Sequence, residues 1–294
     1  MSTHLAPLYP VPGGGVAREL LRRALPHDRV DVVFDEKLFG DDGARSGWVL
    51  GAYEGRAVVG VLAQAGRFVK VLAVDPELRR QGIGGQLLDA ARARADGPLR
   101  IGDHPGNYLS PGVDERYADG LAFLRKRGFV ERARVENLRV PYAGNPLVSG
   151  ARARALAEDA AGVGYRVARP TAAELPALLD FVSRDFAPVW AQEAAHAQRG
   201  PRGALFAAFA ASGAPVAFAA ADGNNQGLGW FGPAGTHPEH RGRRLGEALL
   251  LACLVAVEGL PEAGVIAWIG PKAFYARAAG AVEDRRFVQL EHAA

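Results

Sequence analysis

A basic turn that contains several glycines separates an apolar strand from an apolar-periodic helix in residues 74–88. The first backbone N–H groups of a helix have no partner inside it, so they point outward together and, with the helix dipole behind them, attract anions. Gly82 and Gly84 let the backbone come close to an anion, and Arg79 and Arg80 add positive charge beside it. The turn lacks both the Walker and the Gly-x-Gly-x-x-Gly pattern. We therefore predict a pyrophosphate-binding turn of another kind.

A second basic turn, from Thr236 to Gly246, also follows a strand and precedes an apolar helix. Arg244 stands here where the first turn has Gly82. The backbone N–H is retained, but a Cβ crowds the approach of a ligand. Two interpretations stay open for this turn: a second anion site, or a copy with a purely structural role.

The segment 101–117 joins a short strand to a helix and combines polar side chains with five Gly and Pro residues. Loops at the carboxyl ends of strands are where α/β proteins place ligands. Its carboxylates suit a cationic or polyhydroxylated molecule, and a hydrogen-bonded surface turn is the alternative. The residues predicted to bind such a substrate are Asn107, Tyr108, Asp114 and Glu115.

The elements that must position these residues occur twice in the same order. Each half has an apolar hairpin, a strand that ends near a proline, a basic turn, a long helix, another strand, and a helix that ends in glycine. We therefore predict two domains, at residues 1–143 and 164–294, joined by a linker at 144–163 that holds a short helix over 151–161. Thr171 and Glu174 form a capping box at the start of a later helix.

Composition excludes several classes of protein. The net charge is only +3 and the arginines are scattered, so we expect no nucleic-acid partner. No apolar run reaches the length of a membrane span, no signal peptide is evident, and we expect a cytoplasmic protein without a membrane partner. The single cysteine, Cys253, lies in an apolar run and is expected in the core. No histidine spacing resembles a metal site, including that of His237, Glu239 and His240, so no metal is expected.

The first turn resembles the acetyl-CoA signature of the GNAT superfamily of N-acetyltransferases, (Arg/Gln)-x-x-Gly-x-(Gly/Ala). The resemblance covers both halves and implies an α/β fold of two tandem GNAT domains, each with a mixed sheet that splays open between its fourth and fifth strands. Acetyl-CoA would lie in that gap. The residues implied to bind it are Leu72, Ala73, Val74, Arg79, Arg80, Gln81, Gly82, Ile83, Gly84, Gly85 and Gln86 in the first half, and Thr236, Arg241, Gly242, Arg243, Arg244, Leu245 and Gly246 in the second.

The resemblance also assigns catalytic roles. Backbone N–H groups of the fourth strand would stabilise the oxyanion, and a tyrosine on the last helix would protonate the leaving thiolate. Tyr275 lies close to the place of that acid in the second half, one residue further from the terminal glycine than is usual, whereas the first half carries Leu124 there. Asp103 or His104 is the predicted general base.

These assignments imply direct transfer of an acetyl group to the primary amine of a small acceptor, with an amino sugar favoured because the 101–117 segment looks similar to tandem glucosamine acetyltransferases. A protein or peptide N-acetyltransferase and an acetyl-CoA sensor without turnover remain alternatives. We expect turnover in the first half, and either a monomer, as a pseudo-dimer of its two domains, or a homodimer.

Overall fold

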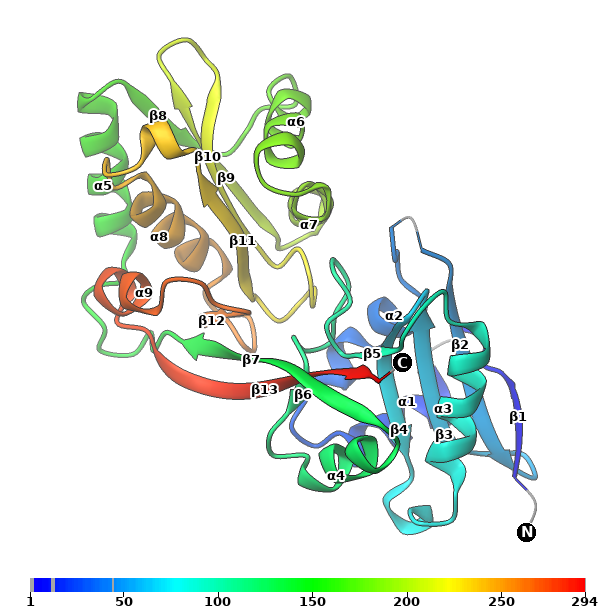
Figure 1. Ribbon diagram of the computed structural model, residues 1–294. Coiled ribbons are helices and arrows are strands. Elements are labelled where there is room, and N and C mark those ends of the chain that lie inside the picture. The colour runs from blue at the N-terminus through cyan, green and yellow to red at the C-terminus, as the bar shows by residue number, and fades with distance from the viewer. Residues whose placement is uncertain (1–2, 12–13, 44, 294) are drawn as a thin grey trace. The chain divides into compact units, whose positions relative to one another are not determined.

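The chain folds into two compact units, each a mixed sheet with helices on both faces (Figure 1). The computed structural model describes residues 3–11, 14–43 and 45–293. The first unit contains the residues up to Val135 and those from Arg285 onward, and the second unit is Glu136–Asp284. The expectation of two tandem α/β domains is confirmed.

The first unit has the strand order β1-β2-β3-β4-β5-β13. Helices α1 and α2 contact each other, and both contact the sheet. Helix α3 contacts β3 and β4. Its elements are β1 (Thr3–Pro7), α1 (Gly15–Ala24), α2 (Val30–Phe39), β2 (Gly47–Glu54), β3 (Ala57–Ala65), β4 (Phe68–Val74), the 3₁₀ turn η2 (Pro76–Leu78), α3 (Ile83–Arg94), β5 (Arg100–Ile101), β6 (Val113–Asp114) and α4 (Ala118–Lys126), with parts of β7 (Phe129–Arg139) and β13 (Val282–His292).

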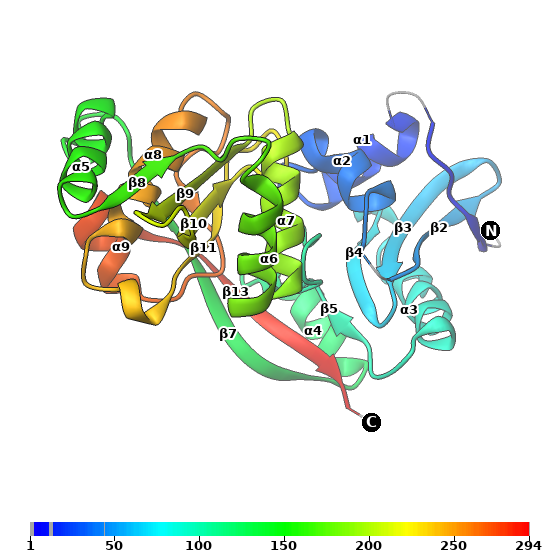
Figure 2. The same ribbon diagram turned by 90° about the horizontal axis from the view of Figure 1, so that it is seen from above.

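The second unit repeats this order as β8-β9-β10-β11-β12-β7. Figure 2 shows α6 and α7 together on one face of β9–β11 and α5 with α8 on the other. Its elements are α5 (Gly150–Gly162), β8 (Tyr165–Ala168), α6 (Leu175–Asp185), α7 (Pro188–Arg199), β9 (Ala204–Ala210), β10 (Pro215–Ala221), β11 (Phe231–Thr236), the 3₁₀ turn η3 (Pro238–His240), α8 (Leu245–Val257), β12 (Val265–Ile266) and α9 (Lys272–Ala279).

The units do not divide where the sequence analysis placed the boundary. In each unit the strand beside the fifth strand comes from the other half of the sequence: β13 pairs with β5 through Leu290 and Ile101, and β7 pairs with β12 through Leu138 and Ile266. Strands β7 and β13 therefore pass from one unit to the other. The predicted linker helix is α5, which packs on α8 as part of the second unit.

Local sequence patterns explain most of the elements. On β10, Ala217, Ala219 and Ala221 face the core that includes α8, and Phe218 and Ala220 face the core that includes α6 and α7. This alternation is the period of a strand buried on both faces. Cys253 lies fully buried in α8 as expected. The capping box forms, with the Glu174 amide donating to Thr171 Oγ1 at 3.3 Å and the Thr171 amide donating to Glu174 Oε2 at 2.8 Å.

A β-bulge interrupts the fourth strand of both units at the same place. On β4 the partners on β3 change from Gln64–Val69 to Ala63–Val71, so Lys70 is the extra residue. On β11 the bulge falls between Phe231 and Ala234. Parallel pairing with the fifth strand reaches only as far as Val69–Ile101 in the first unit and Phe231–Ile266 in the second. Beyond the bulge the fourth strand has no fifth-strand partner among the described residues, which is the splay that the sequence analysis expected.

Candidate active site

The turn after β4 presents the start of α3 without a capping side chain from the described residues. Asp75 accepts a hydrogen bond from the Glu77 amide at 3.1 Å and fixes η2. Arg80 and Gly82 then adopt positive φ angles of 68° and 85°, which turn the chain into the helix. A Cβ on Gly82 would meet no atom within 4 Å, so the space over the turn is open. Arg79, Arg80, Gln81 and Gln86 are all exposed at its rim.

Arg79 fixes the turn to the elements on either side. Its Nε donates to the Val74 carbonyl at 3.4 Å, and its Nη2 donates to the Ala24 carbonyl at the end of α1 at 3.2 Å. Arg23 adds an ion pair with Asp75 at 2.7 Å. The loop that follows α1 therefore starts beside the turn between β4 and α3.

The first turn of α3 also lies close to α4 and the residue that follows it. The guanidinium of Arg127 lies where a Cβ on Gly85 would be, with Nη2 1.8 Å from that position. A Cβ on Gly84 would lie 3.3 Å from the Phe123 ring. A side chain at Gly85 would displace the end of Arg127, and one at Gly84 would press on the Phe123 ring. Arg127, which also pairs with Asp89 at 3.4 Å, adds a positive charge beside the start of α3.

The ladder between β3 and β4 determines which N–H groups face the splay. The Asp75 amide donates to the Val59 carbonyl at 2.9 Å. Since hydrogen-bonded and non-hydrogen-bonded pairs alternate in an antiparallel ladder, Ala73 is directed toward Val61 on β3. Leu72 and Val74 then direct their N–H groups away from β3, toward the open side. The oxyanion donors that the resemblance implies lie in the range from Leu72 to Val74, and in this range the N–H of Ala73 is the one directed to β3.

The turn after β11 has the same backbone shape as the turn after β4. Arg241 Nε donates to the Thr236 carbonyl at 3.2 Å, as Arg79 does to Val74. The two left-handed residues are Gly242, with φ 78°, and Arg244, with φ 57°. The glycine has thus moved from the second left-handed position to the first, and the shape of the turn is kept.

The charges at the second turn are unlike those at the first. Glu247, in the first turn of α8, accepts from Arg244 at 3.0 Å and pairs with Arg152 of α5. Arg244 also pairs with Asp159 of α5 at 3.5 Å. A carboxylate thus occupies the helix start, where a pyrophosphate would bring further negative charge. The Arg243 side chain lies against the Tyr165 ring, with its guanidinium carbon 5.4 Å from the ring centre. Leu245 is buried, and Gly246 packs near Phe274.

Tyr275 and Leu124 hold equivalent places on the last helices of the two units. Each follows a phenylalanine whose ring lies where it would meet a Cβ added to the second glycine of its turn, Phe274 at Gly246 and Phe123 at Gly84. The Tyr275 ring is 6.2 Å from the Phe231 ring, at the point where β11 begins to splay. Burial raises the pKa of its phenol, which suits a group that stays protonated until it donates.

Asp103 and His104 are buried, and their surroundings disfavour the role of general base. Burial raises the pKa of Asp103, and its carboxylate is bonded to Arg100. His104 is fully buried against the Phe68 ring, and neither ring nitrogen has a hydrogen-bond partner in the described chain. Burial and the nearby charge of Lys70 lower the pKa of His104 to about 3. A base with so low a pKa is poorly matched to an ammonium proton.

The other residues predicted for the substrate are engaged in structural contacts. Asn107 accepts from Lys37 at 3.0 Å and donates to Asp42 at 2.9 Å, next to the buried pair of Asp42 with Lys70. This network joins the 101–117 segment to α2. Tyr108 is buried, and Glu115 pairs with Arg134 at 2.7 Å.

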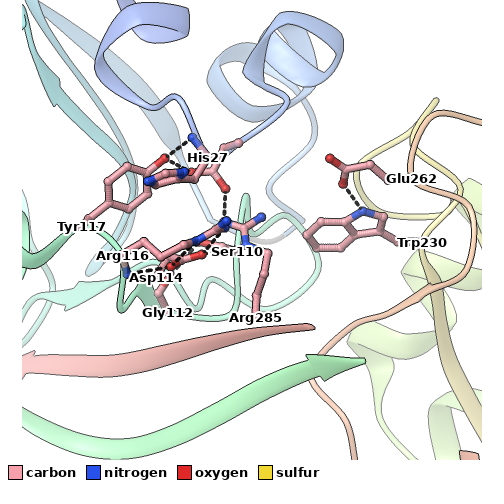
Figure 3. A network of polar contacts seen from close by, with 10 residues as sticks. His27, Ser110, Gly112, Asp114, Arg116, Tyr117, Trp230, Glu262 and Arg285 are labelled. Atoms are coloured by element: carbon pink, nitrogen blue, oxygen red, sulfur yellow. Dashed lines mark hydrogen bonds and ion pairs between the residues drawn. The ribbon is translucent and has the colours of Figure 1, made fainter. Parts of the chain in front are cut away.

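Asp114 belongs to a second network, which the sequence analysis did not anticipate (Figure 3). Arg285 bridges Asp114 at 2.7 Å and Asp28, in the loop after α1, at 2.6 Å. Tyr117 donates to Asp28 at 2.7 Å and accepts from the His27 amide at 3.0 Å. Burial alone would raise the pKa of Asp114, but the hydrogen bonds from Arg116 and the charge of Arg285 hold it below its usual value. The network therefore ties the loop after α1 to the start of α4.

His27 is an exposed side chain at the edge of this network. Its ring packs on Tyr117 with 5.1 Å between the ring centres. Sequence reasoning missed His27, Asp28 and Arg285 because no motif marks them. They meet only when β13 returns to the first unit.

Comparisons with known proteins bear on the fold of the chain and on one of its segments. Residues 45–131 match the family model of the acetyltransferase (GNAT) domain. No curated protein shows a significant match. The chain is similar in structure to a GCN5-related glucosamine N-acetyltransferase region of a fungal multi-domain GH3 beta-N-acetylglucosaminidase, with 18% identity and a TM-score of 0.75 over 99% of this chain. It spans only 38% of the length of that protein.

Two further solved structures match over nearly their full lengths. A tandem GNAT protein from the clavulanic acid biosynthesis pathway has 20% identity and a TM-score of 0.68, with 100% of this chain and 99% of that chain covered. A GCN5-related N-acetyltransferase from Sphaerobacter thermophilus has 16% identity and a TM-score of 0.66, with 98% and 95% covered. Within the described residues no helix has the length and apolar character needed to cross a membrane. Residues 45–131 therefore match the model of the GNAT acetyltransferase domain, and the whole chain has the fold of the tandem GNAT proteins.

Proposed function

We propose that this chain is an N-acetyltransferase that moves an acetyl group from acetyl-CoA to the primary amine of a small acceptor, and that turnover takes place in the first unit. The observation that carries the proposal is the open, uncapped start of α3 within the segment that matches the GNAT family model. An anion held there would receive several N–H groups and the positive end of the helix dipole.

The residues of the first unit fit acetyl-CoA. The pyrophosphate would lie over Gly82 and accept from the N–H groups of Ile83 and Gly84, with Arg80 and Arg127 supplying positive charge. The thioester carbonyl would lie at the splay beyond the bulge, within reach of the Leu72 and Val74 N–H groups. Donors held in place by a sheet stabilise the developing oxyanion without reorganisation.

Direct transfer is supported by the state of the one cysteine. Burial raises the pKa of the Cys253 thiol, which is wholly inaccessible and directed at the Ala219 carbonyl at 3.4 Å. A thiol of this kind is inert as a nucleophile. The acceptor amine would therefore attack the thioester itself, in a complex that holds both substrates.

The acceptor proton requires a base, and His27 is the better-placed group. The His27 ring is exposed and packs on Tyr117 at the start of α4. The loop that carries His27 begins beside the turn between β4 and α3. We assign His27, in place of Asp103 or His104, to accept the proton of the acceptor ammonium. Leu124 offers no proton, so the thiolate leaves the first unit unassisted or takes a proton from water.

An amino sugar is the favoured acceptor. The support is the structural similarity to a protein region described as a glucosamine N-acetyltransferase. Acetyl-CoA would be incubated with glucosamine, amino acids, polyamines and a peptide with a free N-terminus, and the released thiol would be measured. Thiol release with glucosamine above the others supports the proposal. Release only with the peptide indicates a protein N-acetyltransferase, and tight acetyl-CoA binding without any release indicates a sensor.

A further inference from the structure

Two histidines and a glutamate meet at the 3₁₀ turn η3 in the second unit: His237 is its N-cap, and Glu239 and His240 lie within it. His237, Glu239 and His240 each offer one ligand atom, and these atoms all lie within 4.8 Å of one another. The sequence analysis excluded a metal here because the spacing differs from His-x-x-x-His on an α-helix. His237 is the N-cap of η3 and His240 its last residue, however, and the turn brings their ring centres to 5.9 Å from each other.

The equivalent turn of the first unit has structural residues at the same positions. There Asp75 caps the turn by accepting from the Glu77 amide, and Leu78 packs against the apolar core. In the second unit the cap position is His237, whose side chain makes no capping hydrogen bond. The second turn has therefore lost a cap and an apolar contact and gained two imidazoles.

The surroundings of the two rings are those of metal-binding imidazoles. The Tyr165 hydroxyl lies 2.9 Å from His240 Nδ1, so Nε2 is left as the free nitrogen. Metal-binding histidines characteristically use their second nitrogen in such a bond, which fixes the ring and its tautomer. His237 Nδ1 is buried and has no hydrogen-bond partner in the described chain, which is costly for a polar atom unless a ligand satisfies it.

We propose that His237, Glu239 and His240 bind a divalent transition-metal ion, with zinc the preferred ion and water in the remaining position. Two imidazoles and one carboxylate are a donor set that zinc takes in tetrahedral sites. Through Tyr165 the ion would connect η3 to β8. The ion would stabilise the second turn, as the hydrogen bond accepted by Asp75 stabilises the first.

The experiment measures metal binding to the full chain, made without a polyhistidine tag and stripped with a chelator. Zinc chloride alone is titrated by calorimetry, cobalt chloride is followed by its visible spectrum, and bound metal is counted by elemental analysis. We expect one zinc per chain and a tetrahedral cobalt spectrum. His237→Ala and His240→Ala should each lower the affinity by at least about 100-fold, and Tyr165→Phe by about 10-fold.

His4→Ala is the matched control, because His4 is an exposed histidine of the first unit. It should bind zinc as the parent chain does. Circular dichroism checks that each variant is folded, and His237→Asn, which can cap the turn, replaces His237→Ala if that variant unfolds. Equal zinc affinity in the parent chain and in the H237N/H240A double variant overturns the proposal, as does an equal loss in His4→Ala.

Discussion

Gly85 and Glu247 are each the third residue after the N-cap of their helix, α3 and α8, and the charges placed at these two positions are opposite. The guanidinium of Arg127 lies over Gly85, whereas Glu247 places its own carboxylate at the helix start. A helix start favours negative charge, and Glu247 supplies that charge from within the chain. The start of α3 has no such carboxylate, so a bound ligand would supply the negative charge there. This difference, more than the loss of a glycine at Arg244, separates the two turns.

Acetyl-CoA affinity should therefore depend on the first turn alone. Gly82→Val places a β-branched residue at φ 85° above the open site, and it should weaken binding by at least about 10-fold through strain and lost N–H contacts. Gly242→Val is the matched control, because Gly242 has φ 78° and equally open space. It should leave the calorimetric affinity unchanged. If Gly242→Val weakens binding and Gly82→Val does not, acetyl-CoA binds the second unit.

Tyr275→Phe should change the rate of acetyl transfer by less than about twofold. The sequence resemblance places the tyrosine near the position of an acid, but it lies in the unit whose helix start already holds a carboxylate. Steady-state rates at saturating acetyl-CoA and glucosamine measure the effect. A loss of 100-fold or more, the scale of a missing general acid, would assign turnover to the second unit.

His27→Gln should lower kcat by about 10²–10⁴-fold if His27 takes the acceptor proton. Glutamine keeps the size and the backbone amide that donates to Tyr117, so the loop should stay in place. The acetyl-CoA affinity of the variant, measured by calorimetry, should equal that of the parent chain. A rate loss that disappears at high pH, where the acceptor amine is already deprotonated, would complete the assignment. An unchanged kcat would remove His27 from the mechanism.

The turns, hairpins and helix starts could be predicted because their signals are local. The turn from Arg79 to Gly82 and the capping box at Thr171 each depend on residues within one helical turn. The exchange of β7 and β13 could not be predicted, because strand pairing between distant segments leaves no local pattern. The burial of His104 is likewise a tertiary effect. The sequence of a polar loop does not determine whether the His104 imidazole faces solvent or the Phe68 ring.

The buried pair of Asp42 and Lys70 should make a large contribution to the stability of the first unit. Both side chains are almost wholly buried, and Lys70 Nζ lies 2.6 Å from Asp42 Oδ1. Burial lowers the pKa of Lys70. Asp42→Asn would leave the ammonium without a countercharge and should cost about 3–5 kcal/mol in the free energy of unfolding. Hydrogen exchange of β3 and β4 measures this within the first unit.

Asp35→Asn is the control for that measurement, because Asp35 forms an exposed pair with Arg18 at 2.8 Å. Exposed pairs contribute less than about 1 kcal/mol. Lys70→Met combined with Asp42→Asn should recover part of the loss, since no buried charge then remains. An Asp42→Asn chain as stable as the Asp35→Asn chain would contradict the prediction.

His104→Leu tests both the stability and the catalytic interpretation of the buried imidazole. The folded-state pKa of His104 is lowered to about 3, below the ordinary value of 6.5, so the unfolded chain takes up a proton first as the pH falls. The stability that neutral His104 provides is therefore present above pH 6.5 and is lost progressively toward pH 3. The variant lacks this group, so its free energy of unfolding should fall less steeply between pH 7 and pH 5 than that of the parent chain. Equal slopes, from hydrogen exchange of β4 and β5, would contradict the low pKa.

Acetyl transfer by the folded His104→Leu variant should stay within about 10-fold of the rate of the parent chain. A loss of about 10²–10⁴-fold would restore His104 as the general base.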